Sequence, residues 1–142
     1  IVCSAACFGQ LKRHRTSTVL PRPYDPELGI TVPEAITEIG RADDLERIAD
    51  ASAELYLRIK QKDPTAAEYV LTNAHRRRVI FGSNNRALHH ISRLREDQHA
   101  QWDIRNIAIE MVNQAKERNP LLLRLTTGKD QFAKVREKVY RT

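Results

Sequence analysis

The sequence predicts a helix-dominated protein of the α/β or α+β class. Three observations lead to this prediction: three segments whose apolar residues recur at helical spacing, one short strand-like segment, and a proline-rich stretch after the first apolar segment. With 142 residues, the chain is long enough for one domain. It begins with Ile1 rather than Met, so we expect residues 1–142 to be a single domain or a fragment of a longer protein.

The charge balance is the unusual feature of the composition. Lys and Arg number 24 and Asp and Glu 18, which gives a net charge of +6. Such an excess predicts an anionic partner: a phosphate, a nucleotide, a nucleic acid or a membrane surface. The two cysteines are too few for a disulfide scaffold, and no apolar run is long enough to cross a membrane. We therefore expect a soluble, cytoplasmic protein.

Residues 1–19 are mostly apolar, and we expect them to begin with a buried strand or helix and to end at the basic cluster Lys12-Arg13-His14-Arg15. Pro21, Pro23 and Pro26 follow. Because proline lacks an amide hydrogen and fixes its own φ angle, this spacing excludes a helix interior or a central strand. Residues 20–33 are therefore expected to form an ordered loop.

The next segment has the apolar spacing of a helix. Asp43 or Asp44 is expected to cap its N-terminus, and Pro64 is expected to stop it. Thr65 is then expected to cap a short helical turn through Tyr69. The stripe of the long helix, which includes one serine, consists of Leu45, Ile48, Ala49, Ser52, Leu55, Tyr56 and Ile59.

The best strand candidate spans Arg77–Phe81 and ends at Gly82. Side chains alternate between the two faces of a strand, so Arg76 and Arg78 are expected on one face and Arg77 on the other. One of these faces is a candidate pocket wall. A sheet edge protected by charge is the alternative interpretation.

Two further helices follow the strand. Ser83 is expected to cap the first, which runs to about Arg95. The second is expected from about Asp97 to Arg118, where Asn119-Pro120 ends it. The predicted core face of the second helix consists of Ala100, Ile104, Ile107, Ala108, Met111, Val112 and Ala115.

Several polar residues have both a structural and a functional interpretation. The cluster at residues 12–15 is either a phosphate clamp or a solvated turn. Arg95 lies on the apolar stripe of its helix, so it either pairs with a buried group or provides a favourable charge at the helix C-terminus. Asn84 either caps that helix or helps to bind an anion. A lone histidine such as His99 is more often structural than functional.

The sequence contains none of the common signatures of a metal centre or a protein nucleophile. His-Glu-x-x-His, metal-spaced Cys and His pairs, Gly-x-Ser-x-Gly, the P-loop and Gly-x-Gly-x-x-Gly are all absent. We therefore expect no metal site, and an enzyme of this sequence would use no recognisable protein nucleophile.

Two blocks of the sequence resemble the flavin-dependent (alternative) thymidylate synthase family. The first, Gln10-Leu11-Lys12-Arg13-His14-Arg15, is similar to the Gln-x-x-Arg-His-Arg of the family signature. The second runs from Tyr69-Val70-Leu71 through Arg78 to Asn84-Asn85-Arg86-Ala87-Leu88, Leu94-Arg95 and His99-Ala100-Gln101-Trp102-Asp103-Ile104-Arg105. Together the blocks cover roughly residues 8–120, which resemble only the C-terminal part of a family member.

This resemblance implies an α+β fold, helix-dominated with a small, mostly antiparallel sheet, like that of thymidylate synthase complementing proteins. It implies the methylation of deoxyuridine monophosphate (dUMP) to thymidylate, with carbon from methylenetetrahydrofolate and hydride from NADPH by way of FAD. No protein nucleophile is needed in this reaction, because reduced flavin delivers the hydride. The family assembles as a homotetramer with its sites at subunit interfaces.

The resemblance also assigns residues to two sites. FAD would be held by Arg13, His14, Arg15, Asn84, His90 and His99. The nucleotide would be bound by Gln10, Arg78, Leu94 and Arg95. Arg95 would in addition polarise the pyrimidine, as the catalytic residue.

The sequence departs from the family pattern after the first block. Thr18 stands in for a serine, but Pro21, Pro23 and Asp25 occupy the positions of a Glu, a Ser and an Arg that bind the nucleotide phosphate. Prolines lack both the side-chain and the amide donors, and an aspartate repels a phosphate. His90 replaces an Asn but is still able to donate a hydrogen bond. The flavin side is therefore better kept than the nucleotide side.

Two other functions stay open from the sequence. A degenerate family member would keep the fold, and with it a structural or regulatory role, as the changed loop suggests. A basic, helical nucleic-acid-binding module would explain the charge, but only 6% of the residues are aromatic, which is few for base stacking.

Overall fold

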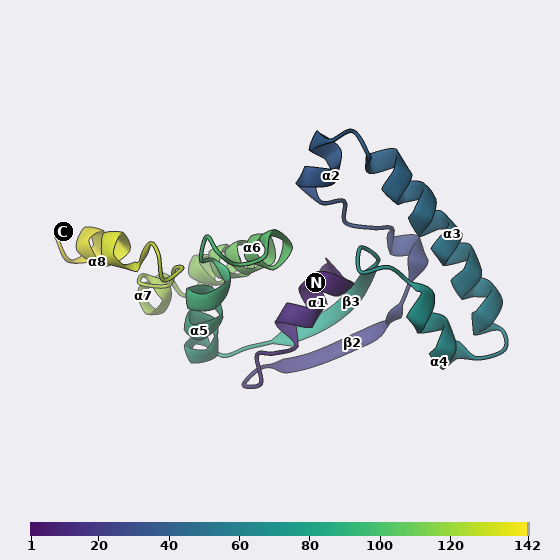
Figure 1. The fold of residues 1–142 in the computed structure, drawn as a ribbon. Coiled ribbons are helices and arrows are strands. Elements are labelled where there is room, and N and C mark those ends of the chain that lie inside the picture. The colour runs from purple at the N-terminus through teal and green to yellow at the C-terminus, as the bar shows by residue number, and fades with distance from the viewer. Residues whose placement is uncertain (142) are drawn as a thin grey trace. The chain divides into compact units, whose positions relative to one another are not determined.

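The computed structural model describes residues 1–141 and shows an α+β protein in which helices predominate over a three-stranded sheet (Figure 1). The predicted fold class is confirmed. The chain is divided into two compact units. The first unit contains residues 1–6 and 20–79, and the second contains residues 7–19 and the chain from residue 80 onward.

The sheet has the strand order β1-β3-β2. Strand β1 (Val2–Ser4) pairs antiparallel with β3 (Arg76–Gly82), and Val2 lies opposite Arg78. The predicted strand over residues 77–81 is confirmed as the central strand. Its side chains alternate as predicted, because Arg77 is buried and Arg78 is exposed.

The expectation of a loop after residue 19 is wrong, because β2 spans Thr18–Tyr24. This strand lies at the edge of the sheet, which explains how it accommodates Pro21 and Pro23. An edge strand has hydrogen-bonding groups that face no neighbour, so the missing amide hydrogens cost little. The exclusion of a central strand at these prolines holds.

Helices of the first unit pack against one another. Its largest helix, α3 (Ala42–Lys60), confirms the predicted long helix and packs against α4 and η2 (Figure 1). The N-cap is Arg41 rather than Asp43 or Asp44, which instead lie in the first turn and complement the helix dipole. The remaining helices of this unit are η1 (Pro26–Leu28), α2 (Glu34–Glu38), α4 (Pro64–Ala67) and η2 (Glu68–Val70).

The N-cap of α4 also differs from the prediction. Asp63, rather than Thr65, caps this helix, and its Oδ1 accepts hydrogen bonds from the Thr65 and Ala66 amides, both at 2.9 Å. Pro64 therefore begins α4, where the absence of an amide hydrogen costs nothing.

The second unit is built on helices that pack against one another. Helix α5 (Asn85–Arg95) packs against α6 (Trp102–Arg118), and α7 (Pro120–Leu123) packs against both. Leu88, Val112 and Leu123 form the buried cluster at their junction. The other helices are α1 (Ala5–Leu11), most of which belongs to this unit, and α8 (Phe132–Tyr140).

Two predicted helix starts in this unit are wrong. Asn84 rather than Ser83 caps α5, because its Oδ1 accepts the Ala87 amide at 2.8 Å. Helix α6 begins at Trp102 instead of Asp97, because Gln101 caps it by accepting the Ile104 amide at 3.0 Å. Residues 96–101 therefore form a connecting loop. Within residues 1–141, no helix is both long and apolar enough to span a membrane.

Candidate functional site

A cluster of three polar side chains joins α1 to α5 within the second unit. Arg95, the last residue of α5, donates from Nε to His14 Nε2 at 3.0 Å and from Nη1 to Gln10 Oε1 at 2.8 Å. Gln10 lies in the last turn of α1, and the His14 amide donates to the Leu11 carbonyl, so the chain turns back toward Arg95. We call these three residues the Gln10–His14–Arg95 cluster.

His14 is a neutral acceptor in this cluster. Its side chain is only 5% exposed. Burial, followed by the positive charge of Arg95 and then by His90, lowers the pKa of His14 to about 4. A guanidinium only donates, so the Nε2 that receives it carries no proton and Nδ1 does. His14 therefore orients Arg95 without adding a competing charge.

Arg95 keeps two donors free after its bonds to Gln10 and His14 are made. A guanidinium has five N–H groups. Two short bonds use one on Nε and one on Nη1, and Nη2 donates to the Gln10 carbonyl at 3.5 Å, which leaves two N–H groups without a partner within residues 1–141. Burial lowers the pKa of Arg95, and the nearby charge of Arg13 adds to this. The ordinary pKa of arginine is so high that the group stays charged. Arg95 is thus a fixed cation with donors available to a further partner.

A pocket of about 490 Å³ lies at the N-terminal end of α5. It is lined by Thr16, Asn84, Arg86, Ala87 and His90. The His90 ring lies edge-on to His14 with 6.3 Å between the ring centroids, so His90 contacts the cluster and also lines the pocket. The structure thus brings together five of the residues assigned from the sequence: Gln10, His14, Asn84, His90 and Arg95.

Three arginines of the second unit have no carboxylate partner within residues 1–141. Arg86 lines the pocket at α5, while Arg13 and Arg15 lie exposed on the turn after α1. A set of exposed guanidinium groups with no carboxylate partners suits a ligand that carries phosphates.

Arg86 and Thr16 received no role from the sequence. Arg86 lies in the first turn of α5, where the helix dipole disfavours a cation. An arginine at such a position, with no acidic partner four residues away, is the signal that would have identified it. Thr16 offered no comparable signal, because only the folded turn brings it to the pocket.

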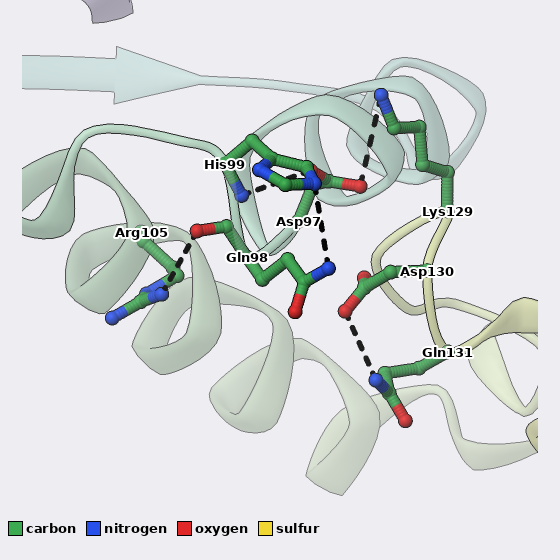
Figure 2. Close-up of polar contacts among 7 residues, drawn as sticks. All are labelled: Asp97, Gln98, His99, Arg105, Lys129, Asp130 and Gln131. Atoms are coloured by element: carbon green, nitrogen blue, oxygen red, sulfur yellow. Dashed lines mark hydrogen bonds and ion pairs between the residues drawn. The ribbon is translucent and has the colours of Figure 1, made fainter.

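His99 lies in the loop between α5 and α6. Its amide donates to Asp97 Oδ1 at 3.0 Å, and its ring Nε2 lies 3.3 Å from the Gln98 side-chain nitrogen (Figure 2). The ring is exposed. Leu94, next to Arg95, is also exposed. Arg78 belongs to the first unit, where it is exposed on β3.

Residues 21–25, where the sequence departs from the family pattern, make contacts within the first unit. Asp25 caps η1, since its Oδ1 accepts the Glu27 amide at 3.1 Å. The buried Arg77 guanidinium stacks over the Tyr24 ring at 4.2 Å and donates from Nε to the Arg22 carbonyl at 3.1 Å. The Asp25 carboxylate, the Tyr24 ring and the Arg22 carbonyl are thus used to hold the local fold.

No group of three or more His, Cys, Asp or Glu residues within residues 1–141 is arranged to hold a metal ion. The donors of the candidate site are arginines, histidines and amides. Such a set of donors can bind and orient an anion and polarise a carbonyl group.

Comparisons with known proteins agree with these features. A family model described as "Thymidylate synthase complementing protein" matches residues 1–121. The chain is 31% identical over 140 aligned positions to a "Probable flavin-dependent thymidylate synthase" of Mycobacterium phage D29, covering 84% of this chain and 60% of the phage protein. It is 26% identical to a "Flavin-dependent thymidylate synthase" of Thermococcus onnurineus, covering 84% and 53%.

A third relative, "UPF0159 protein Ta1429" of Thermoplasma acidophilum, is 29% identical and covers 86% of this chain but 25% of its own length. The chain therefore spans between a quarter and three-fifths of the length of these relatives. The matched region includes the whole Gln10–His14–Arg95 cluster and the pocket at α5. On the evidence of this match and of the site within it, the chain belongs to the thymidylate synthase complementing protein family.

Proposed function

We propose that this chain is the flavin- and nucleotide-binding part of an FAD-dependent thymidylate synthase. The reaction is the methylation of dUMP to thymidylate, with methylenetetrahydrofolate as carbon donor and NADPH as reductant. The observation that carries the proposal is the Gln10–His14–Arg95 cluster, in which a cation is held on two sides and keeps free donors. It lies in the part of the chain that matches the family.

The residues at the α5 pocket fit a dinucleotide such as FAD. Arg13, Arg15 and Arg86 have no carboxylate partners within residues 1–141 and are suited to pyrophosphate oxygens. FAD would be held by Arg13, His14, Arg15, Asn84, His90 and His99. Bound FAD supplies the redox chemistry of the reaction. These residues bind and orient it, and the cap at Asn84 fixes the start of the helix that lines the pocket.

Arg95 would act on the pyrimidine. Gln10 and neutral His14 fix the direction of its guanidinium, which lowers the entropy lost when a substrate binds. Its remaining N–H groups would donate to a pyrimidine carbonyl oxygen, stabilising negative charge that develops there. Gln10 and Leu94 would line the nucleotide site beside it, and the family resemblance also assigns Arg78 to nucleotide binding.

The remaining parts of the proposal rest on the family resemblance. The folate and NADPH would bind to the assembled enzyme, and the protein would act in the cytoplasm. The assembly would be a homotetramer, in which neighbouring subunits complete each site. The exposed positions of Arg13, Arg15 and His99 leave room for such completion.

A second candidate function has a specific observation in its favour. Residues 21–25, which would bind the nucleotide phosphate in the family, instead hold the local fold through Asp25 and the partners of Arg77. A family member that retains flavin but has no synthase activity would show this arrangement. It would serve a structural or regulatory role.

The visible absorption spectrum of the purified protein, followed by a turnover assay with dUMP, folate and NADPH, separates these functions. A yellow protein that forms thymidylate supports the synthase. A yellow protein without turnover supports the second candidate. A colourless protein that binds DNA with a steep salt dependence would contradict both.

A further inference from the structure

The C-terminal segment after α7 packs onto the loop that carries His99. Leu123 is fully buried in the core cluster with Leu88 and Val112. Three residues later, buried Thr126 places its Oγ1 2.8 Å from Nδ1 of His89 on α5. These two contacts fix the direction in which residues 127–131 leave the helices.

Gly128 brings the two backbones into direct contact. A Cβ atom at this position would lie 2.9 Å from the Asp97 nitrogen and 2.9 Å from the Glu96 carbonyl carbon. It would also lie 2.6 Å from Asp130 Oδ1. Such distances leave no room for a side chain, so a residue other than glycine would push the segment away from residues 96–97.

Polar contacts of Lys129 add to the contact that Gly128 makes with the loop between α5 and α6 (Figure 2). The Lys129 amide donates to the Arg93 carbonyl at 3.1 Å, and Lys129 Nζ lies 3.8 Å from Asp97 Oδ2. That oxygen is buried and has no hydrogen-bond donor within residues 1–141. Lys129 therefore provides the charge that balances Asp97, a residue that is only 3% exposed.

Asp97 and Gln98 are in turn the residues that hold His99. Asp97 Oδ1 accepts the His99 amide at 3.0 Å, and the Gln98 side-chain nitrogen lies 3.3 Å from the His99 ring. The Gln98 carbonyl accepts from Arg105 Nη1 on α6 at 3.3 Å (Figure 2). A continuous series of contacts thus connects Lys129 to His99 through Asp97.

We propose that residues 123–131 form a clamp that positions His99, with Lys129 and Gly128 as positioning residues for the flavin site. The role of His99 in flavin binding rests on the proposed function, whereas the clamp itself rests only on the contacts described above. The family match ends at residue 121, so the clamp lies beyond the matched part.

Two variants test the clamp, each with a matched control. Lys129→Met removes the charge that balances Asp97, and Lys134→Met, on exposed α8, is its control. Gly128→Ala introduces the excluded Cβ, whereas the control Gly9→Ala meets no atom within 4 Å. Hydrogen exchange at the His99 amide and the flavin dissociation constant are measured for each variant. The flavin dissociation constant is measured again for each variant in a His99→Ala background.

We expect Lys129→Met to accelerate exchange at the His99 amide and to weaken flavin binding about two- to five-fold, because Lys129 is partly exposed. Gly128→Ala should weaken flavin binding about ten-fold or more, because the backbone itself must move. Neither change should weaken flavin binding further when His99 is already Ala.

Equal losses with and without His99 would show a general structural effect and overturn the positioning role. Unchanged exchange at the His99 amide would overturn the clamp itself. If the wild-type protein binds no flavin, the proposed function fails, while exchange at the amide still decides whether the clamp holds the loop.

Discussion

Two segments of this chain carry polar residues that the family resemblance assigns to ligand binding, and the structure uses these residues differently. In the second unit, Gln10 and His14 hold Arg95 and leave two of its five N–H groups free. In the first unit, Asp25 caps η1 and the partners of Arg77 are Tyr24 and a backbone carbonyl. A polar group that is oriented but keeps free donors is prepared for a ligand, whereas one used by its neighbours maintains the fold.

The largest effect is expected at Arg95. Arg95→Ala should lower turnover by at least about 100-fold, because it removes an oriented donor to the pyrimidine, while flavin absorbance stays largely intact. Arg93→Ala, two residues earlier on the exposed side of α5, should change turnover little. Steady-state assays with dUMP compare the two. Unchanged turnover in Arg95→Ala would remove Arg95 from the proposed mechanism.

The neutral state of His14 predicts a pH-dependent stability. Its pKa is about 4 in the folded protein and about 6.5 when unfolded, so between these values the unfolded chain binds more protons. Stability should therefore fall as the pH drops from about 6.5 to 4, by up to roughly 3 kcal/mol from this residue.

Urea unfolding of the wild type and of His14→Gln at pH 7.5 and pH 5 measures the contribution of His14 to the pH dependence of stability. Buried His75 in the first unit also has a lowered pKa and contributes in the same direction, so the difference between the two proteins isolates His14. A pH dependence that is the same in both proteins would show that His14 is not held neutral.

Substitutions at two adjacent residues of β3 should have different effects, one on stability and the other on nucleotide binding. Arg77→Met should lower the free energy of unfolding by about 1–3 kcal/mol, because it removes the contacts to Tyr24 and the Arg22 carbonyl. Arg78→Met, on the exposed face, should change it by less than about 0.5 kcal/mol but weaken nucleotide binding. Equal destabilisation in urea unfolding would contradict this division of roles.

The smallest effect is expected at Asp25. Asp25→Ala should cost about 1 kcal/mol of stability through loss of the cap on η1, and Asp25→Asn should retain the cap and the stability. Both variants should keep the flavin content of the wild type. If Asp25→Asn were as unstable as Asp25→Ala in thermal unfolding, the carboxylate would have a role other than capping.

Spacing along the chain was enough to predict α3, α5, α6 and β3, because each has buried residues at helical or alternating spacing. The predicted stripe of α3 is only partly buried, since Ile48 and Leu55 are exposed. Prediction from spacing failed at β2, where proline rules describe central strands and the edge position depends on partners distant in sequence. It also failed at several helix starts, because neighbouring residues such as Ser83 and Asn84 are both good caps and only the backbone decides between them.

The residues of the candidate site divide in the same way. Motif similarity identified Gln10, His14 and Arg95, but their hydrogen bonds depend on how α1 and α5 pack. The C-terminal clamp on His99 had no signal in the sequence. Gly128, the central residue of the clamp, lies in a stretch of sequence with no recognisable motif. The need for glycine there becomes visible only in the fold, where residues 96–97 lie against it.

Titration of the flavin-loaded protein with dUMP, followed in the visible spectrum, tests the central claim directly when wild type, Arg95→Ala and Asp25→Ala are compared. The cluster on α1 and α5 should determine the nucleotide response. The wild type and Asp25→Ala should therefore respond alike, and Arg95→Ala should not respond. A response that survives in Arg95→Ala and is lost in Asp25→Ala would contradict the assignment of the two segments.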